Sequence, residues 1–334
     1  MKVCVTAAES MESGRLDPLL RGIDLPLYGA YHPLGYRAEV TTNSPDVLEA
    51  ARESWGRYGP QFECEPVSLR IVVEAEGEHA EEPAFRQQGH LLSIVSDRAN
   101  FLVGDLQTLS GCGFIARKTA LDHAWLRWFF LESMVQACLE QRYFAAMHAA
   151  CVASNETGVL LCGTSGAGKS TLAYACARAG WTYLSDESVH LLLDAEPGAA
   201  LGKPHQVRFR PDARLLFPEL HPYPATMRPN GKVSLEVPMC ELPQIRTASR
   251  CQIGCVVFLD RLPGKRARAE AVPEAEAVKA LLREKPFLGE ELWARHEATV
   301  RRLTGVPAYR MEYDQLGPAV ELLSRLVGSR RPCN

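Results

Sequence analysis

The chain has 334 residues, of which 46% are hydrophobic and 23% are charged, and its formal net charge is −3. This composition is typical of one elaborated globular domain or of two domains, and it excludes a disordered or fibrous chain. A net charge so close to zero gives no global positive field. We therefore expect neither nucleic acid nor an anionic membrane surface as a partner.

The first 15 residues contain neither a long apolar core nor a cleavage pattern, so we expect no signal peptide. The 11 cysteines are scattered without a repeated spacing, which argues against a disulfide framework and for a reducing compartment. Cys251 and Cys255 are predicted to share one face of a strand, with no second ligand pair to complete a zinc site. We expect a cytoplasmic protein.

Residues 1–118 are predicted to form an α+β N-terminal unit. Alternating segments predict strands at 36–42 and 68–76, and a strand pair joined by a turn within 90–106. A helix is predicted from a Ser44 cap, with Pro45 in its first turn, to about residue 59. The unit has no phosphate-binding glycine pattern, and binding of a substrate or a partner is left open as its role.

A long helix is predicted for the connecting segment 119–147, because its apolar residues recur at helical spacing. Asp122, Arg127, Glu132 and Glu140 interrupt it, and a bilayer would tolerate these charges poorly. The segment is therefore interpreted as a core helix and not as a membrane span.

Residues 148–330 are predicted to form an α/β unit. It begins with a strand pair around a turn at 155–158, followed by a glycine-rich loop and by a helix over 169–179 that Gly180 ends. Further strands follow, and a helix over 317–327 closes the unit.

The glycine-rich loop "GTSGAGKST" matches G-x-x-x-x-G-K-[ST], between an apolar strand and a helix. Glycines let successive N–H groups point at phosphate oxygens, at the positive end of a helix dipole. Lys169 is predicted to reach the β- and γ-phosphates of ATP, and the Ser170 hydroxyl to ligate Mg²⁺. The predicted phosphate-binding residues are Gly163, Thr164, Ser165, Gly166, Ala167, Gly168, Lys169, Ser170 and Thr171.

Two acids follow the loop unusually early in the chain. Asp186 lies one helix, one turn and one short strand after Lys169, and a strand–helix–strand unit brings such a position back toward the loop. Adjacent acids on an extended backbone point to opposite sides, so one would face the substrate and the other the metal or its surroundings. The alternative is a pair of turn acids that caps the next element.

Two further residues have alternative interpretations. Asp260 ends the apolar segment "CVVFLD" and would hold Mg²⁺ in a conventional P-loop hydrolase, although apolar strands often end in Asp. His148 opens the strand that precedes the loop strand. It is either a satisfied structural residue or a neighbour of Asp186 that orients it and shifts its pKa.

The segment 148–193, with its His-led strand, "GVLLCGTSGAGKSTLAYACARAGW" and an acidic pair after "YLS", resembles the catalytic domain of HPr kinase/phosphorylase and its related proteins. Segments such as "VSDRANFLVGDL" and "GCVVFLDR" extend the resemblance more weakly to both sides. The resemblance implies an ATP-dependent kinase with a mixed sheet, of the phosphoenolpyruvate carboxykinase type. It also implies that Asp186 is the base, that Glu187 replaces a second Asp, and that His148 lies near the base.

This sequence departs from the family's pattern in two places. Its acid pair is Asp-Glu and not Asp-Asp, and the longer Glu187 fits a metal or supporting role better than that of a tightly placed base. The glycine-rich segment that accompanies phosphorolysis is absent, and only "LEVP" remains at 235–238. The basic candidates for the γ-phosphate or for an anionic acceptor are Lys203, Arg208, Arg210 and, as the first choice, Lys232.

We expect an ATP- and Mg²⁺-dependent kinase that transfers the γ-phosphoryl group to a hydroxyl of a protein or peptide Ser or of a small molecule, without phosphorolysis. The catalytic residues would be Asp186, His148 and Lys169, with Ser170 and Glu187 on the metal. The alternatives are a catalytically silent nucleotide-binding scaffold and a hydrolase that uses Asp260. The oligomeric state is left open, with a homo-oligomer among the alternatives.

Overall fold

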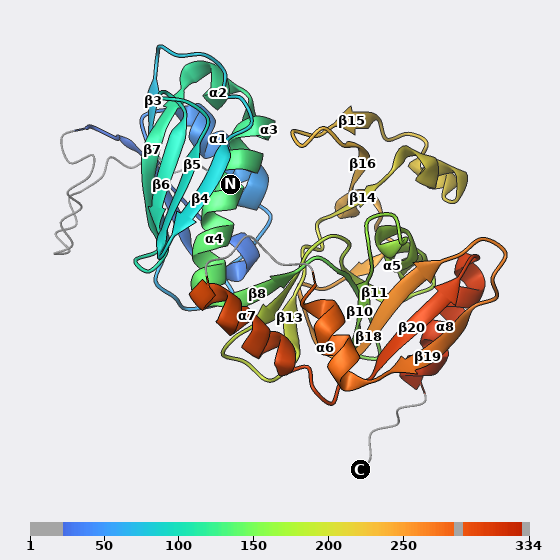
Figure 1. Ribbon diagram of the computed structural model, residues 1–334. Coiled ribbons are helices and arrows are strands. Elements are labelled where there is room, and N and C mark those ends of the chain that lie inside the picture. Colours follow the sequence, from blue (N-terminus) through green and yellow to red (C-terminus); the bar gives the residue numbers. More distant parts are fainter. Residues whose placement is uncertain (1–22, 284–289, 329–334) are drawn as a thin grey trace. The chain divides into compact units, whose positions relative to one another are not determined.

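The computed structural model describes residues 23–283 and 290–328, with the backbone alone for 290–292. The described chain is a mixed α/β protein with two compact units, one up to Arg142 and the other from Tyr143 (Figure 1). The expectation of no signal peptide in residues 1–15 lies outside the described residues, as do the outer ends of both predicted units.

The first unit is a twisted seven-stranded sheet in the order β1-β2-β3-β7-β6-β5-β4. β2, β3 and β7 are parallel neighbours, and the remaining pairs are antiparallel. The two predicted strands within 90–106 are β5 and β6, which confirms that hairpin. The strands are β1 (Leu27–Tyr31), β2 (Ala38–Thr42), β3 (Val67–Glu74), β4 (Ala84–Gln88), β5 (Leu91–Val95), β6 (Phe101–Asp105) and β7 (Ser110–Ala116).

Helices pack on this sheet through small and apolar residues. α1 (Pro45–Trp55) begins at the predicted cap, but the Ser44 hydroxyl donates to the Asp46 carboxylate instead of capping the helix. Met134 of α4 (Glu132–Arg142) lies so close to Gly104 that a side chain at this glycine would overlap its sulfur. This close approach explains why the β6 strand carries a glycine opposite the helix.

The predicted helix over 119–147 is wrong at two places. Asp122 interrupts it because its carboxylate accepts a hydrogen bond from the Trp125 N–H at 3.0 Å, a local bond that competes with helix continuation. Residues 144–147 are strand β8, a short apolar run that periodicity alone cannot separate from helix. The helical run is α2 (Arg117–Leu121), α3 (His123–Trp125), the π-helical turn η2 (Leu126–Leu131) and α4.

The second unit is built on a mixed ten-stranded sheet, with the main path β17-β11-β9-β10-β18-β13-β12-β8. β10 is parallel to β18, which is parallel to β20, whereas β9 is antiparallel to β10, as predicted for the strand pair that opens the unit. The strands are β8 (Phe144–Met147), β9 (Ala150–Ser154), β10 (Thr157–Cys162), β11 (Thr182–Ser185), β12 (Val189–Leu192), β13 (Ala199–Leu201), β17 (Arg246–Thr247), β18 (Arg250–Arg261), β19 (Arg268–Val272) and β20 (Ala308–Tyr313).

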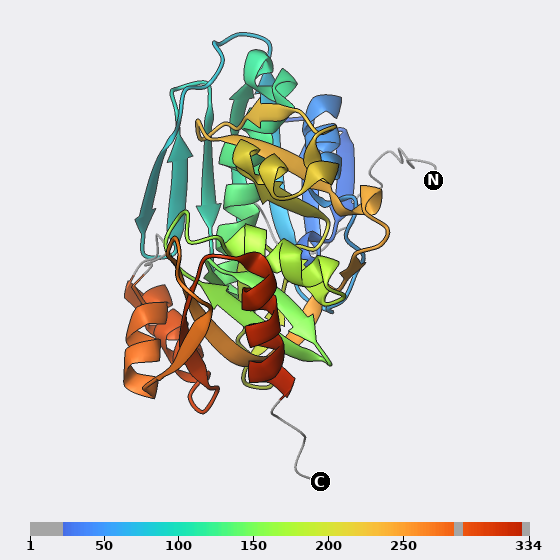
Figure 2. The ribbon, with the colours of Figure 1, turned by 90° about the vertical axis from the view of Figure 1, so that its right-hand side faces the viewer.

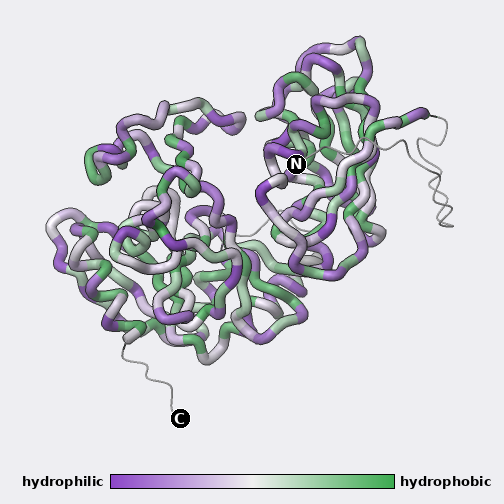
Figure 3. Tube along the Cα trace, turned by 180° about the vertical axis from the view of Figure 1, so that it is seen from behind, coloured by the Kyte–Doolittle hydropathy of each residue, from purple (hydrophilic) through white to green (hydrophobic). Residues whose placement is uncertain are grey.

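Helices cover both faces of this sheet (Figure 2), and a separate hydrophobic cluster lies under each layer. α5 (Lys169–Arg178) and α8 (Leu316–Gly328) pack against one face. α6 (Glu274–Leu281) and α7 (Glu290–Arg301) cover the other. Figure 3 shows hydrophobic residues through the interior of each unit and hydrophilic residues on the outer loops.

A smaller three-stranded sheet, in the order β14-β16-β15, extends from the second unit (Figure 1). β14 (Gln206–Phe209) pairs with β16 (Val233–Pro238), and β15 (Ala225–Met227) forms a hairpin with β16 around the Asn-Gly turn. Short 3-10 turns lie beside these strands: η3 (Pro211–Leu215), η4 (Pro218–Leu220) and η5 (Met239–Glu241); η1 (Pro33–Gly35) is in the first unit.

The prediction that Cys251 and Cys255 share one face is wrong. The register of β18 against β10 shifts by one residue beside Gly254, which is a β-bulge. Beyond the bulge the faces are exchanged, so Cys255 packs under α5 and Cys251 packs on the opposite side.

Candidate functional site

The glycine-rich loop connects β10 to α5, as its motif predicts. Gly163, Gly166 and Gly168 have φ values of 152°, 93° and 91°, a backbone region that favours glycine. The Ala167 N–H donates to the Thr164 oxygen at 3.1 Å and closes a turn within the loop. The three glycines therefore allow the tightly curved backbone that a phosphate-binding loop requires.

Tyr313, at the end of β20, holds the far side of this loop. Its buried hydroxyl donates to the Ala167 oxygen at 3.0 Å. A side chain at Gly168 would overlap this hydroxyl. The sequence reasoning did not identify Tyr313, because nothing local connects a strand end at residue 313 with a loop about 150 residues earlier.

Lys169 is the first residue of α5 and is largely buried. Its ammonium group donates to the main-chain oxygens of Gly163 at 2.6 Å and Thr164 at 3.4 Å, so it lies across the loop. The N–H groups of the first helical turn have no acceptor within the helix, and the helix dipole is positive there. Together these features fit a bound chain of phosphates.

His148 lies opposite the acid pair. β11 and β12 both pair with the β8–β9 segment: Ser185 is opposite Cys151, and Val189 is opposite Met147. His148 therefore faces the three residues that connect β11 to β12. It is exposed, and it lies in the bend just before β9, not in the strand that it was predicted to open.

Asp186 is buried directly after β11. One carboxylate oxygen accepts a hydrogen bond from the Tyr183 hydroxyl at 3.0 Å, and the other accepts one from the Arg208 main-chain N–H at 2.9 Å. Burial raises the pKa of Asp186 to about 6, with the Glu187 charge acting in the same direction, and the two hydrogen bonds limit the rise. A carboxyl group with this pKa is a suitable proton acceptor near neutral pH.

Glu187 belongs to a cluster of four alternating charges. Its carboxylate is 2.8 Å from the Arg208 guanidinium and 3.5 Å from that of Arg228. Both arginines also lie near Glu236, at 2.9 Å and 3.8 Å. The pKa of Glu187 is lowered despite burial, because these two cations and His148 stabilise its charge.

This cluster joins the acid pair to the three-stranded sheet, since Arg208 and Glu236 are opposite each other on β14 and β16. Sequence reasoning did not find Arg228 or Tyr183. The alternation of "QVRF" gave Arg208 as a candidate but not its partner. The role of Glu187 in metal binding stays a prediction. In the structure its carboxylate forms ion pairs with Arg208 and Arg228.

The remaining basic candidates lie at different places. Arg210, just after β14, has its guanidinium 3.4 Å from the Ser165 hydroxyl of the loop. Lys232 is exposed in the β15–β16 turn, where its N–H donates to the Asn230 side chain. Lys203 is exposed; burial lowers the pKa of His190, and the charge of Lys203 acts in the same direction.

Asp260 lies near the end of β18, but it points away from α5. Leu259 belongs to the cluster under α5, so its neighbour Asp260 faces the opposite side of the sheet. It is 53% exposed and is 3.9 Å from the Arg310 guanidinium. The geometry therefore gives no support to a hydrolase that holds its metal through Asp260.

Within residues 23–283 and 290–328, no three His, Cys, Asp or Glu side chains come together as a metal-binding group. In the same residues, no helix combines the length and the apolar composition that crossing a bilayer requires.

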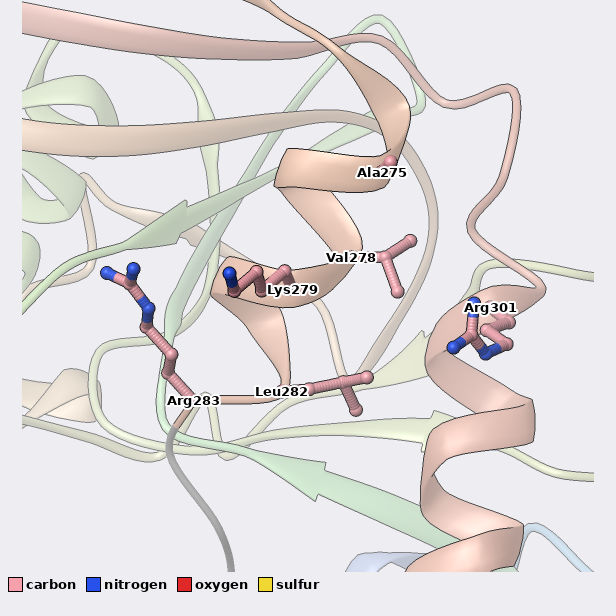
Figure 4. A pocket seen from close by; sticks show the side chains of 6 residues that line it. All are labelled: Ala275, Val278, Lys279, Leu282, Arg283 and Arg301. Carbon is pink, nitrogen blue, oxygen red and sulfur yellow. The ribbon is translucent and has the colours of Figure 1, made fainter.

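A hollow of about 590 Å³ lies between α6 and α7, away from the loop. Val278 of α6 and Leu282, just after this helix, point toward Arg301 of α7 (Figure 4), and Arg301 is held by Glu297. The hollow borders residue 283, where the described chain is interrupted, and we assign no ligand to it.

Comparisons with known proteins give only a distant likeness. No family model matches the chain, and no curated protein matches it. Among solved structures, the HPr(Ser) kinase/phosphatase from Coxiella burnetii matches over 55% of this chain and 94% of that one, with 12% identity and a TM-score of 0.29. This is a remote resemblance in fold.

Proposed function

We propose that this protein is an ATP-dependent kinase that transfers the γ-phosphoryl group to a hydroxyl group. The observation that carries the proposal is the contact between the two halves of the site: the Ser170 hydroxyl donates to the Asp186 main-chain oxygen at 3.5 Å. A phosphate-binding loop and a buried acid with a raised pKa thus adjoin each other. Phosphoryl transfer to a hydroxyl needs both.

In this reaction Asp186 accepts the proton of the attacking hydroxyl. The hydroxyl oxygen forms a bond to the γ-phosphorus, the bond from that phosphorus to the β–γ bridging oxygen breaks, and ADP leaves. Lys169 and the loop N–H groups stabilise the charge that develops on the phosphate oxygens. The donor set around Ser170 also fits Mg²⁺, which would neutralise phosphate charge and which is held mainly by phosphates, water and one hydroxyl. Such a site does not need a cluster of three acids.

The experiment incubates the protein with γ-labelled ATP and two acceptor panels, Ser-containing peptides and hydroxylic small molecules, and locates the label by mass spectrometry. Asp186→Asn is expected to bind ATP like the wild type and to transfer about 10²- to 10⁴-fold more slowly. Asp194→Asn, an exposed acid in a turn, is the matched control and should transfer normally. Undiminished transfer by Asp186→Asn would rule out the base assignment.

A nucleotide-binding scaffold without turnover is the second candidate. The ion pairs of Glu187 with Arg208 and Arg228 favour it, because a carboxylate engaged by two cations is less available to a metal ion. The two hydrogen bonds on Asp186 point the same way. Binding of ATP with no phosphorylated product across both acceptor panels would support the scaffold over the kinase.

A further inference from the structure

Arg210 approaches the phosphate-binding loop from outside the β10–α5 unit. Its Nη2 lies 3.4 Å from the Ser165 hydroxyl. A Cβ atom added at Gly166 would come within 3.6 Å of the same nitrogen and within 3.9 Å of the Cζ atom. The guanidinium therefore lies over the middle of the loop, within van der Waals distance of Gly166.

Three arginines near Arg210 in the sequence already have partners. Arg208 and Arg228 share the carboxylates of Glu187 and Glu236. Arg214 donates to the Tyr223 main-chain oxygen. Arg210 makes no ion pair with any carboxylate in the described ranges, and its partner is the loop hydroxyl. An arginine next to such a loop and without an acid partner is available to bind an anion there.

We propose that Arg210 binds the terminal phosphate of the nucleotide and makes the site prefer a triphosphate to a diphosphate. The proposal rests on the proposed function for the identity of the ligand. Loop N–H groups cradle the inner phosphates, whereas the terminal phosphate carries the greatest charge and receives the fewest main-chain donors. A guanidinium offers a planar pair of N–H donors that matches two phosphate oxygens, so its contribution is greatest at that phosphate.

The experiment measures ATP and ADP affinities by isothermal titration in Mg²⁺, using the full chain and the variant Arg210→Met. We expect ATP binding to weaken about 10- to 100-fold and ADP binding by less than about threefold, as for the loss of a charge-assisted hydrogen bond. Arg210→Lys should recover part of the ATP affinity, because it keeps the charge but not the planar fork. Arg246→Met is the matched control: Arg246 is exposed and lies beside Gly180, at the other end of α5, and its loss should change neither affinity.

The outcomes separate this proposal from the kinase. Equal weakening of ATP and ADP by Arg210→Met, or no weakening, overturns the role of Arg210 even if the wild type phosphorylates an acceptor. Selective loss of ATP affinity in a protein that phosphorylates nothing supports Arg210 while the kinase proposal fails. A wild type that binds neither nucleotide overturns both.

Discussion

The Ser170 hydroxyl of α5 donates to the Asp186 main-chain oxygen over 3.5 Å, which ties the first turn after the loop to the residue that follows β11. Ser170 thereby has two tasks in the proposed site: it holds the acid-bearing bend, and it offers its oxygen to Mg²⁺. These tasks are compatible, because a hydroxyl can donate its hydrogen to one partner while its lone pairs face a cation.

Replacing Ser170 tests whether its hydroxyl contributes to ATP binding through Mg²⁺. Ser170→Ala is expected to weaken ATP binding at least about tenfold in the presence of Mg²⁺, because it removes an oxygen ligand. In EDTA the affinity should be close to that of the wild type. Ser170→Thr keeps the hydroxyl and serves as the control. An equal loss with and without Mg²⁺ would show that Ser170 acts only by holding the bend.

Asp186 gives a stability prediction with a defined sign. The pKa of Asp186 is raised from 3.8 to about 6 in the folded protein. Its contribution to the free energy of unfolding is therefore most favourable below its pKa in the unfolded chain, and it is lost as the pH rises through about 6. This difference in pKa between the folded and the unfolded chain corresponds to about 3 kcal/mol of folding stability lost at high pH. Asp186→Asn, which cannot ionise, should therefore be more stable than the wild type at about pH 8 and close to it at about pH 4. Thermal melts of both proteins across this range test it, and a gap that does not change with pH would contradict it.

The same titration predicts the pH dependence of transfer. The proton acceptor must be ionised, so the rate should fall as pH decreases through about 6, the pKa of Asp186. Transfer rates measured across this pH range with saturating ATP and acceptor show this decrease, which is the acidic limb of the pH profile. The residual activity of Asp186→Asn should lack it. If the limb persists in that variant, another group is the base.

The position of the glycine-rich loop, and the return of the acid pair to its vicinity, could be predicted from the sequence, because both depend on local patterns. A glycine pattern between a strand and a helix has few other uses, and one helix plus one short strand brings residue 186 back to the same edge of the sheet. The partners of the acids could not be predicted. Arg228 lies just after β15 and Glu236 lies on β16, so their pairing depends on the geometry of that hairpin and not on a local pattern.

Side-chain direction was the other failure of sequence reasoning. An unbroken strand would have put Cys251 and Cys255 on one face, and the bulge beside Gly254 exchanged the faces. The same packing decides which way Asp260 points. One inserted residue reverses every later side chain of a strand, and nothing in "CQIGCVVFLD" except its glycine indicates where that happens.

The four-charge cluster predicts a measurable contribution of Glu187 to stability. Its pKa is lowered from 4.5 in the fold, so the stabilisation is present above that value and is lost as pH falls through the lower folded value. Glu187→Gln should cost about 1 kcal/mol at neutral pH, since the pair is partly exposed to solvent. The cost should vanish at low pH.

Chemical denaturation at neutral and at acidic pH measures this cost. The exposed pair between Arg268 and Glu312 supplies the control, because Glu312→Gln should change the free energy of unfolding much less. Equal effects of the two variants would mean that the cluster is no stronger than an ordinary surface ion pair.

Gly168 permits the sharpest test of the loop. Its φ of 91° is strained for any side chain, and a Cβ atom there would also overlap the Tyr313 hydroxyl that holds Ala167. Gly231 has a φ of 74° with no atom within 4 Å of such a Cβ, so Gly231→Ala isolates the backbone penalty of about 1 kcal/mol.

Gly168→Ala should cost more than this and should abolish ATP binding. Adding Tyr313→Phe should recover part of the stability, because the overlapping oxygen is gone, but not ATP binding, because the bond to the loop is lost. Equal unfolding free energies for Gly168→Ala and Gly231→Ala would show that the loop adjusts without strain.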